Sequence, residues 1–229
     1  MSTQTSFKFK NNWLLILSFA MLSILAGCAK SSDPIVVEGS AKLRIVNGVP
    51  GSAPQDFYLD VTKIGTNVAF GESLAYQTVK SGAVNLFYTA TGTQNVNASL
   101  GAFLTPDQSY TVFYAKSSAG QTGILGFQDD TSTPQTGRAA VRFINLNASS
   151  TATISINVVG GNQLISGLAE NTPSLSYAVD PAIALTATFT GTTTLITIPA
   201  ATFVAGKSYI VWFTGTTAAD FVPHIIATP

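Results

Sequence analysis

Cysteine, histidine and charged side chains are all scarce in this sequence. With one cysteine, Cys28, and one histidine, His224, the chain cannot build a zinc site from several thiolates or imidazoles. A Ser-His-Asp hydrolase would have to use His224. A single cysteine forms no internal disulfide, so the fold must rest on its hydrophobic core. Only 10% of the residues are charged and the formal net charge is zero, which argues against nucleic acid as a partner.

The N-terminus has the three parts of a bacterial export signal. Lys8 and Lys10 precede an apolar stretch at 13–25, which is shorter than the roughly 20 residues of a membrane-spanning helix. The sequence LAGC at 25–28 then resembles the lipobox of bacterial lipoproteins. That resemblance implies cleavage between Gly27 and Cys28, with diacylglyceryl lipid, palmitate included, on the Cys28 thiol. An ordinary secretory signal with a chance cysteine is the alternative.

Residues 28–40 are expected to form a tether between lipid and fold. Its twelve residues after the cysteine have a root-mean-square reach of about 20 Å. Ala29 follows the cysteine where aspartate would retain an enterobacterial lipoprotein at the inner membrane, so outer-membrane localisation is expected. The stretch KSSD at 30–33 holds one acid, so the acidic export signal of some Bacteroidetes lipoproteins is weak or absent. Both the periplasmic and the cell-surface face of the outer membrane are therefore kept as locations.

The remainder of the chain repeats itself at an offset close to 100 residues. Three short stretches recur in the same order: LRIVN at 43–47 as VRFIN at 141–145, SLAY at 73–76 as SLSY at 174–177, and SYTVF at 109–113 as SYIVW at 208–212. A recurrence of this kind indicates a duplicated domain. The predicted organisation is a signal peptide at 1–27, the tether at 28–40, a first repeat at 41–129, a linker at 130–137 and a second repeat at 138–229.

Within each repeat the apolar residues alternate with period two. Runs rich in Val, Ile, Thr and aromatics are bounded by Gly, Pro, Asn and Asp, as at 182–189, 194–198 and 209–213. Lys, Glu and Arg, which usually cover exposed helix faces, are rare. We therefore predict an all-β protein with two tandem β-sandwich domains, immunoglobulin-like or transthyretin-like, with about seven or eight strands in each.

Several stretches resemble one bacterial family, the domain of unknown function numbered 4397. They are AKLRIVN at 41–47, GSAP at 51–54, FYLD at 57–60 and, in the second repeat, GKSY at 206–209. The resemblance covers 41–128 well and 138–227 more loosely. It implies extracytoplasmic β domains, often duplicated, on Bacteroidetes-type lipoproteins, and it implies no activity. In the second repeat, FYLD is matched to ISIN at 154–157, where the acid is lost.

A search for catalytic or metal-binding residues is negative, so catalytic residues, metal ligands and cofactors are all predicted as none. The sequence GESLA at 71–75 falls short of a nucleophile elbow and is expected to place Ser73 in a turn before a strand. Asp129 and Asp130 could offer oxygen ligands to calcium, but adjacent acids in a linker are more often a solvated turn.

Four pairs of adjacent aromatic residues are the best lead to function: 57–58, 87–88, 113–114 and 212–213. Neighbouring side chains on a strand point to opposite faces, so one ring of each pair should enter the core and the other should point out. Tyr58, Tyr88, Tyr114 and Trp212 are the expected binding surface, for a protein or a glycan. Burial where the two domains meet or under a loop is the alternative.

Two further pairs of matched residues are read as structural. Tyr110 and Tyr209 each open a late strand, where a tyrosine often bonds back to a loop. Arg44 and Arg142 are expected on the solvent side of the first strand of each repeat, as a surface ion pair or an edge-strand gatekeeper.

Two functions fit these observations. The first is a lipid-anchored, non-enzymatic binding or adhesion module of the cell envelope that holds an envelope protein or a glycan. The second is a structural or assembly subunit of the envelope with periplasmic partners, in which strand edges pair with a neighbour. A sandwich fold alone does not choose between them.

Overall fold

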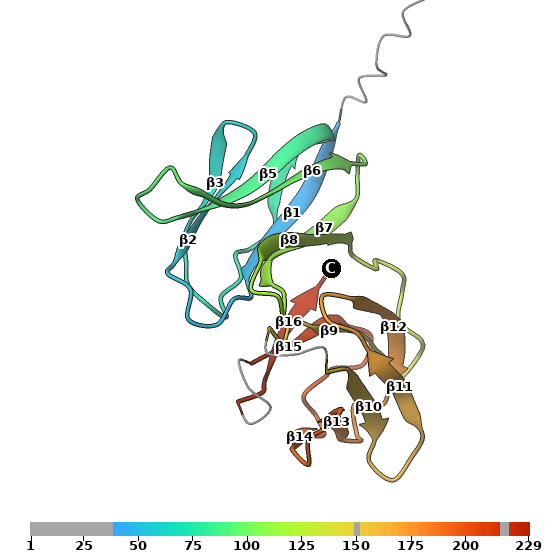
Figure 1. The fold of residues 1–229 in the computed structure, drawn as a ribbon. Helices are drawn as coiled ribbons and strands as arrows, with labels where there is room; N and C mark the ends of the chain where they lie inside the picture. The colour runs from blue at the N-terminus through green and yellow to red at the C-terminus, as the bar shows by residue number, and fades with distance from the viewer. Residues whose placement is uncertain (1–38, 149–151, 216–219) are drawn as a thin grey trace, which may run out of the picture. The chain divides into compact units, whose positions relative to one another are not determined.

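The structure is a computed structural model that describes residues 39–148, 152–215 and 220–229, and all regular secondary structure in these ranges is β-strand (Figure 1). The first eight strands are β1 (Ser40–Asn47), β2 (Gln55–Leu59), β3 (Thr62–Val68), β4 (Gln77–Lys80), β5 (Gly82–Ala90), β6 (Val96–Leu104), β7 (Ser109–Lys116) and β8 (Thr122–Gln128).

These eight strands form a sandwich of two four-stranded sheets, in the orders β4-β1-β7-β8 and β3-β2-β5-β6. β1 pairs with β4 in antiparallel and with β7 in parallel orientation. Alternate residues of each strand face inward, as the period of two requires. Leu43 and Ile45 of β1 thereby meet Phe57, Leu86 and Tyr88 in a core whose members are each at most 8% exposed.

The second eight strands repeat this arrangement. They are β9 (Ala139–Asn145), β10 (Ile154–Val158), β11 (Gln163–Leu168), β12 (Pro173–Val179), β13 (Leu185–Phe189), β14 (Leu195–Ile198), β15 (Ser208–Thr214) and β16 (Val222–Thr228). Their sheet orders, β12-β9-β15-β16 and β11-β10-β13-β14, match those of the first half strand for strand. The prediction of an all-β fold with two sandwiches is confirmed.

Both sandwiches belong to one compact unit, Val37–Pro229, and a third apolar cluster joins them. It consists of Val46, Phe113, Ala115, Ile144, Leu146, Ile210 and Trp212. These residues come from β1 and β7 of the first sandwich and from β9, the segment after it, and β15 of the second. One face of each of these sheets therefore packs into the core of its own sandwich, and the other face packs against the other sandwich.

Arg44 and Arg142 lie at matched positions in β1 and β9 and reach across this contact. Arg44 Nη1 donates to the backbone carbonyl of Ala227 at 2.5 Å, and Arg142 Nη1 donates to that of Gln128 at 2.8 Å. Each guanidinium also lies over an aromatic ring, 4.1 and 5.0 Å from its centroid. The prediction of a surface ion pair or edge gatekeeper was wrong, because β1 and β9 are inner strands and this face is covered.

The matched tyrosines have the structural role predicted for them. The Tyr110 hydroxyl accepts a hydrogen bond from the backbone N–H of Thr105 at 2.9 Å, and the Tyr209 hydroxyl accepts one from Val204 at 3.1 Å. Each bond spans five residues and ties the start of β7 or β15 to the loop before it.

Candidate functional site

Three of the four residues predicted as a binding surface are buried. Tyr88 is 0%, Tyr114 4% and Trp212 1% exposed, and only Tyr58 is half-exposed. Tyr88 and Tyr114 point into the first sandwich, with ring centroids 5.2 Å apart, and Trp212 lies in the cluster between the sandwiches. The prediction was wrong for these three rings.

The reasons differ between the strands. In β5 one ring of the pair does point out, but it is Phe87, because the Tyr88 hydroxyl finds buried acceptors in the carbonyls of Val46 and Val112, at 3.2 Å each. In β7 and β15 both rings of each pair are buried, because these strands have a core on either face. Burial at the domain contact, the alternative reading, therefore applies to Trp212.

Gly27, Cys28 and the tether up to residue 38 lie outside the described residues. The cleavage site, the lipid on Cys28 and the outer-membrane localisation stay predictions.

Tyr58 and Phe87, both half-buried, lie in one row across the outer face of sheet β3-β2-β5-β6. Tyr58 of β2 is paired with Lys63 of β3 on one side and with Phe87 of β5 on the other, and Phe87 is paired with Ser99 of β6. The Tyr58 and Phe87 rings are stacked, with centroids 5.0 Å apart and planes 7° apart. We call Lys63, Tyr58, Phe87 and Ser99 the outer aromatic row.

The row leaves one ring face open. Strands in a sheet are about 4.8 Å apart, so two parallel rings with this centroid spacing stand upright on the sheet, face to face. Lys63 covers the far face of Tyr58, with its Nζ 5.4 Å from the ring centroid. The far face of Phe87 is turned toward Ser99, an exposed residue whose side chain is too small to cover it.

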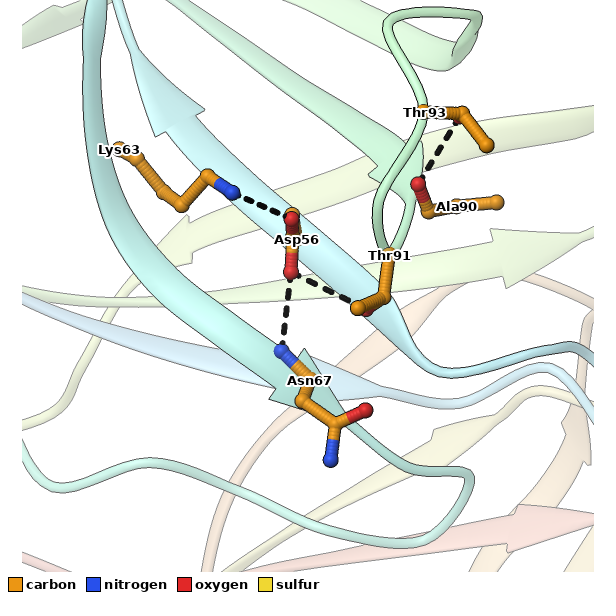
Figure 2. Close-up of polar contacts among 6 residues, drawn as sticks. All are labelled: Asp56, Lys63, Asn67, Ala90, Thr91 and Thr93. Carbon is orange, nitrogen blue, oxygen red and sulfur yellow. Dashed lines mark hydrogen bonds and ion pairs between the residues drawn. The ribbon is translucent and has the colours of Figure 1, made fainter.

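A buried carboxylate holds Lys63 in place (Figure 2). Asp56, 1% exposed, accepts hydrogen bonds from Lys63 Nζ at 2.5 Å, from the backbone N–H of Asn67 at 3.0 Å and from the Thr91 hydroxyl at 3.0 Å. Burial acts to raise the pKa of Asp56, but these hydrogen bonds outweigh it and the pKa is lowered. The Asp56 hydrogen bond raises the pKa of Lys63, so the pair is ionised at neutral pH.

The second sandwich has no counterpart of this row. In the first sandwich Tyr58 pairs with Lys63, and Leu59 pairs with Leu86. The matching pairs of the second sandwich are Asn157 with Gln163, and Val158 with Leu185. By this register, Tyr58 is replaced by Asn157, Phe87 by Thr186, Lys63 by Gln163 and Asp56 by Ser155.

This register also corrects the sequence match of 57–60 to 154–157, which is two residues off. Phe57 pairs with Gly65, three residues before the end of β3, and Ile156 pairs with Ile165, three residues before the end of β11. Phe57 therefore corresponds to Ile156. A shift of two residues leaves every side chain on the same face, so the hydrophobic alternation could not detect the error.

Asp129, one of the two acids considered for calcium, is buried rather than in a solvated turn. It is 4% exposed, and its carboxylate accepts hydrogen bonds from the hydroxyls of Tyr76 at 2.7 Å and Thr111 at 2.8 Å. Burial raises the pKa of Asp129 and also that of Tyr76. Within the described ranges, no group of three or more His, Cys, Asp and Glu side chains could hold a metal ion.

His224 lies in an aromatic environment. Its ring is stacked on Trp212, with centroids 5.0 Å apart, and its Nε2 is 2.9 Å from the Thr214 hydroxyl, a buried group. Burial lowers the pKa of His224. The hydroxyl bound to this imidazole therefore belongs to Thr214 and not to Ser73.

A cavity of about 260 Å³ lies beside the β7–β8 hairpin. No charged side chain lines it; the lining residues are Ala115, Ser117, Gln121, Thr122, Gly123, Ile124, Leu125 and Asn171. It contains none of the residues singled out from the sequence.

Two buried asparagines, each at the end of a stretch that repeats in the sequence, have matched roles. Asn47 and Asn145 donate to the backbone carbonyls of Val68 and Leu168, each at 3.1 Å. The side-chain oxygen of each asparagine accepts the backbone N–H two residues on, also at 3.1 Å. Their recurrence at the end of LRIVN and VRFIN was the signal that could have identified them.

Over the part of the chain that the structure describes, no helix is long and apolar enough to cross a membrane.

Comparisons with curated proteins and with solved structures give no argument about function. A comparison with curated proteins gave no match. Among solved structures, the carbohydrate-binding module CBMbc (family CBM26) of Eubacterium rectale Amy13K, crystallised with maltoheptaose, aligns with 82% of this chain and 97% of its own. Its sequence identity is 13% and its TM-score 0.28, too low to bear on a ligand of this chain.

The family comparison agrees with the resemblance seen in the sequence. The family model described as Domain of unknown function (DUF4397) matches residues 41–156, just over half of the chain. The match starts at β1, covers the first sandwich and continues to β10 of the second. The chain therefore belongs to the DUF4397 family.

Proposed function

We propose that this protein is a non-enzymatic glycan-binding protein of the bacterial cell envelope, with the outer aromatic row as its binding surface. The observation that carries the proposal is the stacked pair Tyr58 and Phe87, half-exposed on a sheet whose counterpart carries Asn157 and Thr186. The second sandwich forms the same topology without these rings, so the fold does not require them.

The chemistry of the row suits a sugar. One face of a pyranose ring carries mainly C–H groups, which are apolar and slightly positive and pack well on the negative face of an aromatic ring. The open face of Phe87 supplies that contact, and the hydroxyls of Ser99 and Tyr58 and the ammonium of Lys63 supply hydrogen-bonding groups beside it.

The proposed anchor brings the site close to the membrane. Lipid chains on Cys28 would contribute about 0.8 kcal/mol for each buried CH₂, so two or three chains hold the protein stably. The tether would keep the first sandwich within a few tens of ångströms of the outer membrane. This anchoring is supported by the sequence at 25–28 and by the apolar stretch before it.

Affinity electrophoresis tests the binding surface. The full-length protein in detergent is run in gels that contain barley β-glucan, arabinoxylan, galactomannan or soluble starch, and in gels with the acidic polymers polygalacturonate or alginate. We expect retardation by at least one polymer and loss of that retardation in Phe87→Ala. Thr186→Ala, at the matched position of the second sandwich, is the control and should run like the parent protein.

Equal retardation of Phe87→Ala and the parent would refute the row as the binding surface. No retardation by any polymer would refute glycan binding itself. Chemical unfolding of each variant verifies that the substitution has left the fold intact.

Protease shaving of intact cells tests the location. Peptides from 41–229 released by whole cells would show surface display and support adhesion or capture of external glycans. Their release only after the outer membrane is opened would support the periplasmic alternative, an envelope-assembly subunit.

A further inference from the structure

A strip of small, uncharged residues runs along β5 and β6 from the outer aromatic row. Asn85 is paired with Gly101 and Ala83 with Phe103, and these pairs follow Phe87 and Ser99 toward the start of β5. Side chains two residues apart share a face, so all six residues lie on the outer face. We call Phe87, Ser99, Asn85, Gly101, Ala83 and Phe103 the β5–β6 strip.

The strip has an aromatic ring at each end. Phe87 is half-exposed, and Phe103 is 56% exposed. Phe103 lies four residues along β6 from Ser99, the partner of Phe87, which corresponds to about 14 Å at the rise of an antiparallel strand. This distance is too long for one sugar ring and suits a short run of sugar units.

We call the surface of the strip between Phe87 and Phe103 its floor, and around Gly101 this floor is open. A Cβ added to Gly101 would meet only the Asn85 side-chain oxygen, at 3.8 Å. The φ of Gly101 is not positive, so neither space nor backbone conformation demands glycine there. The missing side chain keeps the floor low, and the exposed amide of Asn85 beside it can donate and accept hydrogen bonds.

The strip is also uncharged. No Asp, Glu, Lys or Arg occurs anywhere from residue 81 to residue 105. The nearest cation across the row, Lys63, is already paired with Asp56 at 2.5 Å. One carboxylate lies beside the strip, since Asp60 accepts the backbone N–H of Asn85 at 2.8 Å. The strip itself carries no cation to match an acidic polymer, and it favours a neutral ligand.

From these observations we infer that the β5–β6 strip binds an extended run of neutral sugar units lying along the two strands, with one unit on Phe87 and another on Phe103. The inference rests on the proposed glycan-binding function and adds the charge class of the ligand, its length and a second contact residue. Asn85 contacts the units between the two rings.

Isothermal titration of the full-length protein with defined oligosaccharides tests it. The probes are cellohexaose, xylohexaose, mannohexaose and maltohexaose, each with its disaccharide. We expect at least one hexasaccharide to bind tenfold or more tighter than its disaccharide. Phe103→Ala should weaken the hexasaccharide roughly tenfold and leave the disaccharide unchanged, since only the longer chain reaches that ring.

Two variants separate the strip from general effects on folding. Gly101→Gln raises the floor without backbone strain and should abolish hexasaccharide binding. Val96→Ala removes another exposed apolar side chain of β6 outside the strip and should change nothing. Each variant is first compared with the parent by chemical unfolding.

Three results would overturn the inference while leaving glycan binding intact: equal affinity for hexasaccharide and disaccharide, full affinity of Phe103→Ala, or Phe87-dependent retardation by polygalacturonate or alginate alone. Absence of retardation by every polymer would instead refute the proposed function, and the inference would fail with it.

Discussion

Replacement of Asn47 by alanine should destabilise the first sandwich far more than an average asparagine substitution. The side chain is 0% exposed and joins three segments: the end of β1, the turn after it and the end of β3. In Asn47→Ala the N–H of Val49 and the carbonyl of Val68 lose their hydrogen bonds to the Asn47 side chain, and both residues are at most 5% exposed.

The magnitude follows from the two buried groups that lose a hydrogen bond. Each buried donor or acceptor without a hydrogen bond costs about 1–3 kcal/mol, so we expect a loss of about 2–6 kcal/mol. This is a large share of the 5–15 kcal/mol typical of a folded domain. Asn145→Ala removes the matched bonds of the second sandwich and should have a similar effect.

Urea unfolding followed by far-UV circular dichroism measures these losses. Asn162→Ala is the control: this asparagine is exposed, and its loss should change the free energy of unfolding by less than about 0.5 kcal/mol. If Asn47→Ala loses less than about 1 kcal/mol with an unchanged urea dependence, the bonds of Asn47 do not hold the three segments together.

Three further predictions concern single hydrogen bonds and pH. Tyr110→Phe should cost about 0.5–1.5 kcal/mol in urea unfolding, because the N–H of Thr105 loses its acceptor; an unchanged value would refute the role of the hydroxyl. Burial lowers the pKa of His224, so the unfolded chain binds a proton at a higher pH than the folded chain does, and stability falls as pH drops below about 6.5. Between pH 7.5 and 5.5 the free energy of unfolding should therefore fall less in His224→Gln than in the parent. The pKa of Asp56 is lowered in the folded state, so its contribution is present above about pH 3.9 and is lost in more acidic solution. Between pH 5 and 3 the parent should therefore lose more stability than Asp56→Asn, and parallel curves would contradict this.

The fold could be predicted because its determinants are local and repeated. The alternation of apolar residues predicts strands, and the recurrence of LRIVN as VRFIN predicts two copies of one arrangement. The bond from the Tyr110 or Tyr209 hydroxyl to a loop was also predictable, because it spans only five residues.

The candidate site could be predicted only in part, because alternation says that two neighbouring side chains face opposite ways and not which face is covered. Trp212 does point away from its own sandwich, but the contact with the first sandwich buries it. Tyr88 is buried because its hydroxyl donates hydrogen bonds to distant carbonyls, those of Val46 and Val112. Both outcomes depend on residues far away in the sequence, which a local pattern does not contain.

The duplicated architecture itself separates what the fold needs from what is added to it. Asn47 and Asn145, Tyr110 and Tyr209, and Arg44 and Arg142 make equivalent contacts in both halves, so these contacts belong to the shared framework. The stacked rings and the pair of Lys63 with Asp56 occur in one half, on a sheet that forms equally well in the other without them. Exposed rings and a buried carboxylate both carry a cost in solubility or desolvation that the framework can evidently avoid. The face on which they occur is therefore where a binding function is to be sought, and substitutions there should alter binding while matched substitutions in the second half do not.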